Sequence, residues 1–99
     1  MERKMKPVHP GSILREDILK EMNLSITKAA TGLQISRKQL SEIVNETASI
    51  SAEMAVRLEQ AFGVSAEFWL DLQKKYDIWK VQNSGRVHVN RFEHKHMPG

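Results

Sequence analysis

Arg37 and Lys38 are the side chains of this sequence best placed to bind an anion. They stand at the start of residues 36–45, SRKQLSEIVN, where apolar positions recur with helical spacing. Ser36 is a suitable N-cap, and Gln39 can complete a capping box with it. Because a helix start already carries partial positive charge, two cations there oppose the helix dipole. This arrangement favours an anionic partner such as nucleic acid, and an ordinary solvated basic pair is the alternative.

The helix predicted over 36–45 has one apolar side and one polar side. Its aliphatic residues recur at i, i+3 and i+4, and its polar residues lie about half a turn away at ~100° per residue. The apolar stripe consists of Leu40, Ile43 and Val44. The polar set consists of Arg37, Lys38, Ser41, Glu42 and Asn45. The polar set is therefore free to face a partner or solvent.

The composition predicts one small domain. The chain has 99 residues, of which 40% are apolar and 27% charged, and it has no cysteine for a disulfide or a thiolate metal site. No apolar run approaches the ~20 residues of a membrane span. The first residues lack the apolar core of a signal peptide, so a cytoplasmic location is expected. The net charge of +3 is compatible with nucleic acid but is not diagnostic.

Catalysis is not indicated. The four histidines are His9, His88, His94 and His96, and the last three lie in the C-terminal tail. The pair His94 and His96 could hold a metal, but no carboxylate cluster or rigid element supports it. No nucleophile and base share a suitable spacing, and no glycine-rich phosphate loop exists. We therefore predict a protein that is not an enzyme and needs no cofactor or metal.

The first half of the chain predicts an arm followed by three helices. Residues 1–8 are charged and form the arm, and a first helix follows to about Met22, with Leu14, Ile18 and Met22 on its buried side. Ser25 can cap a second helix over 25–32, which a turn of about three residues joins to the helix at 36–45. Two short helices connected in this way have the layout of a helix-turn-helix, here about 25–45.

Two further helices are predicted from cap residues and apolar stripes. Ser51 and Gly63 bracket the fourth helix, and Ser65 starts a fifth that extends to about residue 82. The fifth carries more aromatic surface than four other helices can cover. Phe68, Trp69 and Leu72 are predicted to join the chain's own core. Tyr76, Ile78 and Trp79 are predicted to face a partner, most simply a second copy, because large aromatics dominate interface energetics.

The chain after residue 83 is predicted to be a partly disordered tail. Asn83, Ser84 and Gly85 form a break, after which residues 86–92 alternate in polarity. That alternation allows a short strand. The helical domain is therefore expected over 9–83 and the tail over 84–99.

The segments LSITKAATGLQISRKQLSEIVN and ISAEMAVRLEQAFGVSAEFWLDLQKKYD resemble the Xre/Cro helix-turn-helix family. Within that family, the motifs HPGSIL and GVSAEFWLDLQ resemble the HigA/VapI antitoxin branch of type II toxin–antitoxin systems. The resemblance covers residues 6–78. It implies an all-α, five-helix fold, a homodimer, and an operator DNA with two half-sites. It also implies a partner toxin similar to the RelE-type mRNA endonucleases, which the antitoxin would neutralise while repressing its own operon.

The resemblance also implies which residues meet DNA. By position in the motif, Arg37, Lys38, Ser41 and Glu42 match places that face the groove. The places that commonly touch phosphate are matched by Ser25, Lys28, Ser36, Gln39 and Asn45.

Three residues depart from the family pattern. Ile26 stands where a glutamine usually reaches the DNA backbone, and Gln34 stands where the turn usually has glycine. Glu46 follows Asn45 where glycine and a basic residue are usual, which places a negative charge beside the expected phosphate track. Two alternatives to the antitoxin therefore stay open: a protein-interaction module whose DNA affinity is lost, and a stand-alone repressor without a toxin.

Overall fold

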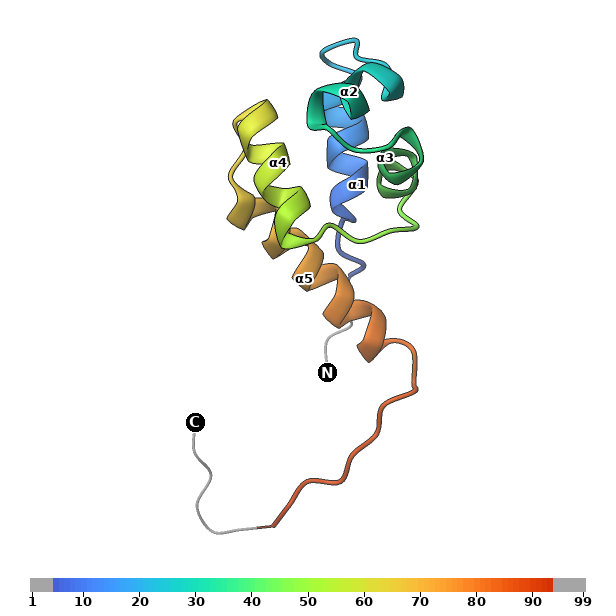
Figure 1. The fold of residues 1–99 in the computed structure, drawn as a ribbon. Helices are drawn as coiled ribbons and strands as arrows, with labels where there is room; N and C mark the ends of the chain where they lie inside the picture. Colours follow the sequence, from blue (N-terminus) through green and yellow to red (C-terminus); the bar gives the residue numbers. More distant parts are fainter. Residues whose placement is uncertain (1–4, 94–99) are drawn as a thin grey trace.

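The computed structural model describes residues 5–93, and within them the fold is entirely helical. Figure 1 shows the helices in chain order, with α5 running away from the others towards the C-terminal segment. The elements are α1 (Pro10–Ile13), a π-helical segment (Leu14–Leu19), α2 (Ile26–Leu33), α3 (Arg37–Val44), α4 (Ala52–Phe62) and α5 (Ala66–Gln82). The predicted all-α, five-helix fold is confirmed.

The first helix differs from the prediction because it widens after α1. The Lys20 amide donates to the Arg15 carbonyl at 3.1 Å, which is the five-residue spacing of a π-helix. The wider turn directs Leu14 and Leu19 into the core, where they are 0% and 3% exposed. Met22 is 56% exposed. Its predicted place on the buried side was wrong, because that prediction assumed a regular α-helical spacing throughout.

Serine caps fix the starts of α2 and α3. The Ser25 hydroxyl accepts a hydrogen bond from the Lys28 amide at 3.1 Å, and the Ser36 hydroxyl accepts one from the Gln39 amide at 3.0 Å. Each bond satisfies an amide that has no partner inside the helix. The α2–turn–α3 unit therefore has defined ends, as its cap residues predict.

Gln34 forms the turn between α2 and α3 in the left-handed conformation, with φ 60°. This conformation costs a non-glycine residue about 1 kcal/mol. The Gln34 side chain is exposed, and only its backbone carbonyl accepts from Arg57. Gln34 therefore adopts a left-handed conformation at the position where the family pattern usually has glycine.

We expect Gln34→Gly to raise the free energy of unfolding by about 0.5–1 kcal/mol, because glycine removes the left-handed strain. The matched control is Gln60→Gly in α4, which should lower it by about 1 kcal/mol, since glycine weakens a helix interior. Urea unfolding of both variants measures the two effects. A Gln34→Gly protein less stable than the parent would show that the turn is not strained.

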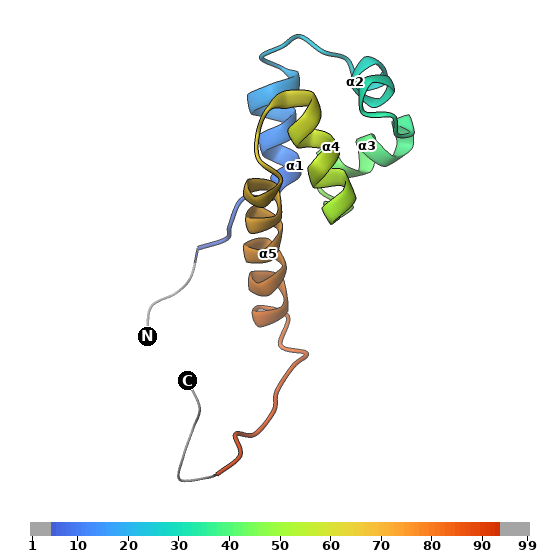
Figure 2. The same cartoon turned by 60° about the vertical axis from the view of Figure 1, so that its left-hand side comes forward.

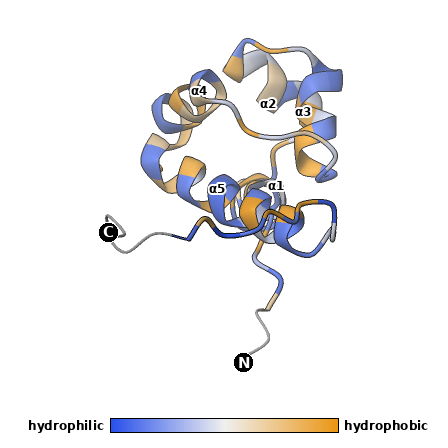
Figure 3. Ribbon diagram, turned by 90° about the horizontal axis from the view of Figure 1, so that it is seen from below, coloured by the Kyte–Doolittle hydropathy of each residue, from blue (hydrophilic) through white to orange (hydrophobic). Residues whose placement is uncertain are grey.

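The core lies where α1, the π-helical segment and α2–α4 meet the first turns of α5. Figure 2 shows α5 leaving this cluster, and Figure 3 shows hydrophilic and hydrophobic stretches alternating along the helices. Among residues 5–93, thirteen apolar residues are buried, and they include the whole predicted α3 stripe of Leu40, Ile43 and Val44. Trp69 at the start of α5 is fully buried and closes the core. The orientation of α3 is therefore set by a continuous apolar contact.

The aromatic start of α5 only partly follows the prediction. Trp69 is buried and Leu72 is half-buried, but Phe68 is 43% exposed. Phe68 packs edge-on against Trp69 with ring centroids 5.7 Å apart. Its predicted core position was wrong because consecutive residues on a helix point about 100° apart, and Trp69 already fills the core side.

Residues 86–93 have no regular secondary structure, so the strand that the sequence allowed is not formed in the described part of the chain. Val87, Val89 and Phe92 are 64%, 79% and 84% exposed. An extended segment needs a neighbouring strand to form a ladder, and a fold made of helices supplies none. His94 and His96 lie outside the described residues.

Candidate nucleic-acid interface

The start of α3 faces solvent. Ser36, Arg37 and Lys38 are exposed, whereas Leu40 on the opposite side is 0% exposed. The helix therefore presents its free amides and both cations outward while the apolar stripe anchors it. This is the arrangement that the sequence predicts for binding an anion.

The structure places the nine predicted DNA-contact residues on α2, on α3 and at their ends. Eight are exposed and Ser41 is half-buried. The starts of the two helices are adjacent, as the hydrogen bond of 3.1 Å from the Arg37 Nε–H to the Thr27 hydroxyl shows. Farther along α3, the Asn45 side-chain amide donates to the Ser41 hydroxyl at 3.3 Å. The nine residues are Ser25, Lys28, Ser36, Arg37, Lys38, Gln39, Ser41, Glu42 and Asn45.

Arg15 holds the C-terminal end of α3. Its guanidinium donates to the Val44 carbonyl and also to the Glu46 carboxylate, the latter at 3.5 Å. Glu46 has φ 64°, the left-handed region that favours glycine. A cation beside the free carbonyls of a helix end is favourable, and here it also offsets the charge of Glu46. The negative charge that departs from the family pattern is thus paired within the protein.

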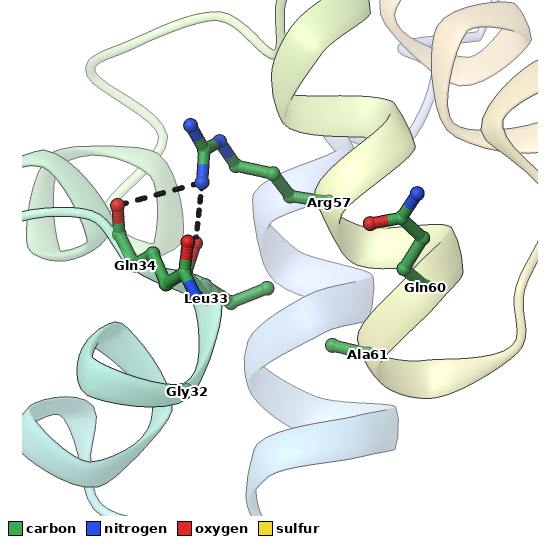
Figure 4. Close-up of a pocket in the computed structure, with 6 residues that line it drawn as sticks. All are labelled: Gly32, Leu33, Gln34, Arg57, Gln60 and Ala61. Carbon is green, nitrogen blue, oxygen red and sulfur yellow. Dashed lines mark hydrogen bonds between the residues drawn. The ribbon is translucent and has the colours of Figure 1, made fainter.

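Arg57 of α4 holds the turn before α3, as Figure 4 shows. Its Nη1 donates to the Leu33 carbonyl at 2.9 Å and to the Gln34 carbonyl at 3.5 Å, and its Nη2 pairs with Glu53 at 2.7 Å. These bonds satisfy carbonyls that lack partners at the end of α2. Arg57 therefore holds the turn that precedes α3, and Arg15 holds the C-terminal end of α3. Sequence reasoning missed both residues, because their acceptors are backbone carbonyls of distant segments.

The residues predicted to face a second copy lie on the projecting part of α5. Ile78 is 50% exposed, and Tyr76 and Trp79 are half-buried with ring centroids 6.1 Å apart. The Lys6 ammonium lies 5.8 Å from the Trp79 ring centroid, a cation–π distance. The described part of the arm therefore packs on α5, where Met5 and Pro7 also line a hollow.

His9 is a buried polar residue that the sequence did not single out. It is 4% exposed and caps α1, where its Nδ1 accepts from the Gly11 amide at 2.9 Å. Its ring packs edge-on against Tyr76, with centroids 4.8 Å apart. Burial lowers the pKa of His9, and the carboxylates of Glu46 and Asp77 oppose this shift only in part. His9 therefore joins α1 to α5 in its neutral form.

We expect the protein to lose stability as the pH falls below about 6.5, the ordinary pKa of histidine. In that range the unfolded chain takes up a proton that folded His9 binds more weakly, so acidification favours unfolding. His9→Asn keeps a capping oxygen but cannot titrate, and it should flatten the pH dependence of the urea midpoint between pH 7.5 and 5. The control His88→Asn, at an exposed position, should leave the dependence unchanged. Equal slopes for His9→Asn and the parent would contradict this prediction.

Two further observations concern the described residues only. Within residues 5–93, no three or more His, Asp or Glu side chains gather as they would around a metal ion. No helix in this range has the length and apolar character needed to cross a membrane.

Residues 16–69 match the family model described as Helix-turn-helix. The chain belongs to the helix-turn-helix family. Virulence-associated protein I of Dichelobacter nodosus is 43% identical over 89 residues, which cover 90% of this chain and 82% of that protein. Other relatives are named as an HTH-type transcriptional regulator in Haemophilus influenzae and as the antitoxin HigA-1 in Vibrio cholerae, and this is not a family of enzymes.

Solved helix-turn-helix structures share this fold. The antitoxin GraA has a TM-score of 0.80 and 34% identity, with 88% of this chain and 100% of that chain covered. The Pseudomonas aeruginosa antitoxin HigA, solved with the higBA promoter, has a TM-score of 0.74 and 36% identity, with 83% and 96% covered. The resemblance to HigA/VapI-type antitoxins that the sequence indicates is confirmed.

Proposed function

We propose that this chain is an antitoxin that binds operator DNA as a homodimer and represses its own operon in the cytoplasm. The single observation that carries the DNA-binding part is the outward, cationic start of α3, in a helix whose preceding turn is held by Arg57 and whose far end is held by Arg15. An element held at both ends can meet a rigid duplex without losing much conformational freedom. The relative HigA was solved with a promoter, which supports the same function here.

In this proposal α3 lies in the major groove. Arg37 donates two hydrogen bonds to the O6 and N7 of a guanine, and Lys38 contacts a second guanine less rigidly. Glu42 can accept from a cytosine amino group. The hydroxyls of Ser25 and Ser36 position the phosphate backbone without reading sequence. A good bidentate pair discriminates between bases by ~1–3 kcal/mol, so the arginine would dominate sequence choice.

In the proposed dimer, the second copy supplies the α3 helix that binds the second DNA half-site. One α3 makes few contacts, whereas two copies on half-sites ~34 Å apart would combine theirs. We assign the dimer contact to Tyr76, Ile78 and Trp79, because α5 leaves the core and exposes apolar surface there. Light scattering of the parent and of Ile78→Glu tests this assignment. We expect a dimer and a monomer respectively, and two dimers would exclude Ile78 from the contact.

The antitoxin part of the proposal requires a toxin partner, which we take to be a RelE-like mRNA endonuclease. It is supported by relatives named as antitoxins. The arm and the chain after Gly85 are the candidate surfaces, since Val87, Val89 and Phe92 are exposed there. Co-expression with the protein encoded beside this one, followed by co-purification, tests the partnership. Failure to co-purify would leave a stand-alone repressor.

A mobility-shift titration with the DNA upstream of the protein's own gene tests operator binding. We expect a retarded complex whose affinity falls steeply as salt rises, because cations released from phosphates drive binding. An unrelated duplex of equal length is the control for specificity. Absence of any complex would favour the alternative of a protein-interaction module that has lost DNA binding.

A further inference from the structure

Thr27 connects the start of α2 to the first residue of α3. Its Oγ1 accepts the hydrogen bond of 3.1 Å from the Arg37 Nε–H. Both side chains are exposed, so the bond adds nothing to the core. What it determines is the direction in which the guanidinium points. This hydrogen bond is therefore better explained by the need to orient Arg37 for binding than by a contribution to the stability of the fold.

Thr27 is itself held in place. It lies in the first turn of α2, which Ser25 caps, and a β-branched side chain on a helix has few rotamers. The Thr31 hydroxyl donates to the backbone carbonyl of Thr27 at 3.0 Å, so it engages an atom other than the hydroxyl that accepts from Arg37. The hydroxyl that accepts from Arg37 is therefore restricted to few positions.

The bond selects one of two ways in which Arg37 can read a base. A guanidinium has five N–H groups in a planar fork and can make a bidentate pair through Nε with one Nη, or through both Nη atoms. Because the Arg37 Nε–H already donates to the Thr27 hydroxyl, only the two Nη groups remain free to bind a base as a pair. We infer that Thr27 is a positioning residue that makes Arg37 read a guanine end-on, through its two Nη groups. This inference rests on the proposed operator binding and adds a specificity-determining residue to it.

The test compares three α2 variants on a set of duplexes. The duplexes carry the DNA upstream of the gene. In each duplex, one G·C pair of the region that the protein protects in a footprint is replaced by A·T. Arg37→Ala first identifies the pair at which the parent discriminates and the variant does not. Thr27→Val removes the acceptor, Thr27→Ser keeps it, and Thr31→Val is the matched control on the same helix.

We expect Thr27→Val to reduce discrimination at the Arg37 base pair about three- to tenfold, in line with the loss of one hydrogen bond. Thr27→Ser and Thr31→Val should discriminate like the parent, and Thr27→Val should have no further effect in an Arg37→Ala background. In the free protein, the Arg37 Nε–H should exchange with water faster in Thr27→Val than in Thr31→Val.

Two results would overturn the inference and leave the proposed function standing. One is a Thr27→Val protein that binds the operator and discriminates like the parent. The other is a uniform loss of affinity for every duplex, which would show a general effect on binding. A parent protein that retards none of the duplexes would instead contradict operator binding itself, and the inference with it.

Discussion

Replacing Gly11 with alanine should destabilise the protein by about 3 kcal/mol. A Cβ atom at Gly11 would lie 1.8 Å from the Ile43 carbonyl oxygen, far inside the contact distance. The obstructing atom belongs to the backbone of α3, so no side-chain rotation can relieve the overlap. Overpacking of this kind typically costs 1–3 kcal/mol, and a backbone clash belongs at the upper end of that range. Urea unfolding measures the loss.

The same substitution at Gly32 should instead raise the free energy of unfolding. Gly32 lies within α2, and a Cβ there would meet nothing within 4 Å. Alanine in a helix interior is favoured over glycine by roughly 0.5–1 kcal/mol, so Gly32→Ala should stabilise. Equal effects of the two variants would contradict the close approach of α1 to α3.

Reversing the charges of Arg37 and Lys38 should abolish operator binding without unfolding the protein. We expect the affinity of the Arg37→Glu/Lys38→Glu variant to fall at least about a hundredfold, since it loses two base contacts per copy and repels phosphate. Its thermal stability should stay equal or rise, because both side chains are exposed and carboxylates favour a helix start. Mobility shift and thermal unfolding measure these two quantities.

The matched control for this variant is Arg86→Glu/Arg91→Glu. Both arginines are exposed beyond α5, and the change in net charge is the same. Near-parental affinity of this control would show that position, not total charge, decides binding. A similar loss in both variants would mean that only long-range electrostatics hold the DNA.

The helical framework was predictable because its signals are local. Ser25 and Ser36 each cap a helix with their own hydroxyl, and the stripe of Leu40, Ile43 and Val44 is buried as its spacing indicates. These features need only neighbours within a few residues, so a sequence contains them in full.

The remaining features depend on contacts that the sequence does not encode locally. Arg15 reaches a carbonyl 29 residues away and Arg57 reaches one 24 residues away. Gln73 is buried, and its side-chain oxygen accepts a hydrogen bond from the Ile50 amide at 2.8 Å, across 23 residues. Hydrogen-bond partners that are this far apart in the sequence are determined by the tertiary structure and cannot be predicted from local sequence patterns.

Dimethyl sulfate footprinting of the upstream DNA most directly tests the central claim that α3 reads the major groove. The reagent methylates guanine N7, which lies in that groove. We predict that the protein protects guanine N7 in two clusters centred about 10 base pairs apart, and that Arg37→Ala removes one protected guanine from each cluster. Protection that is absent, or that is the same for Arg37→Ala, would contradict the claim.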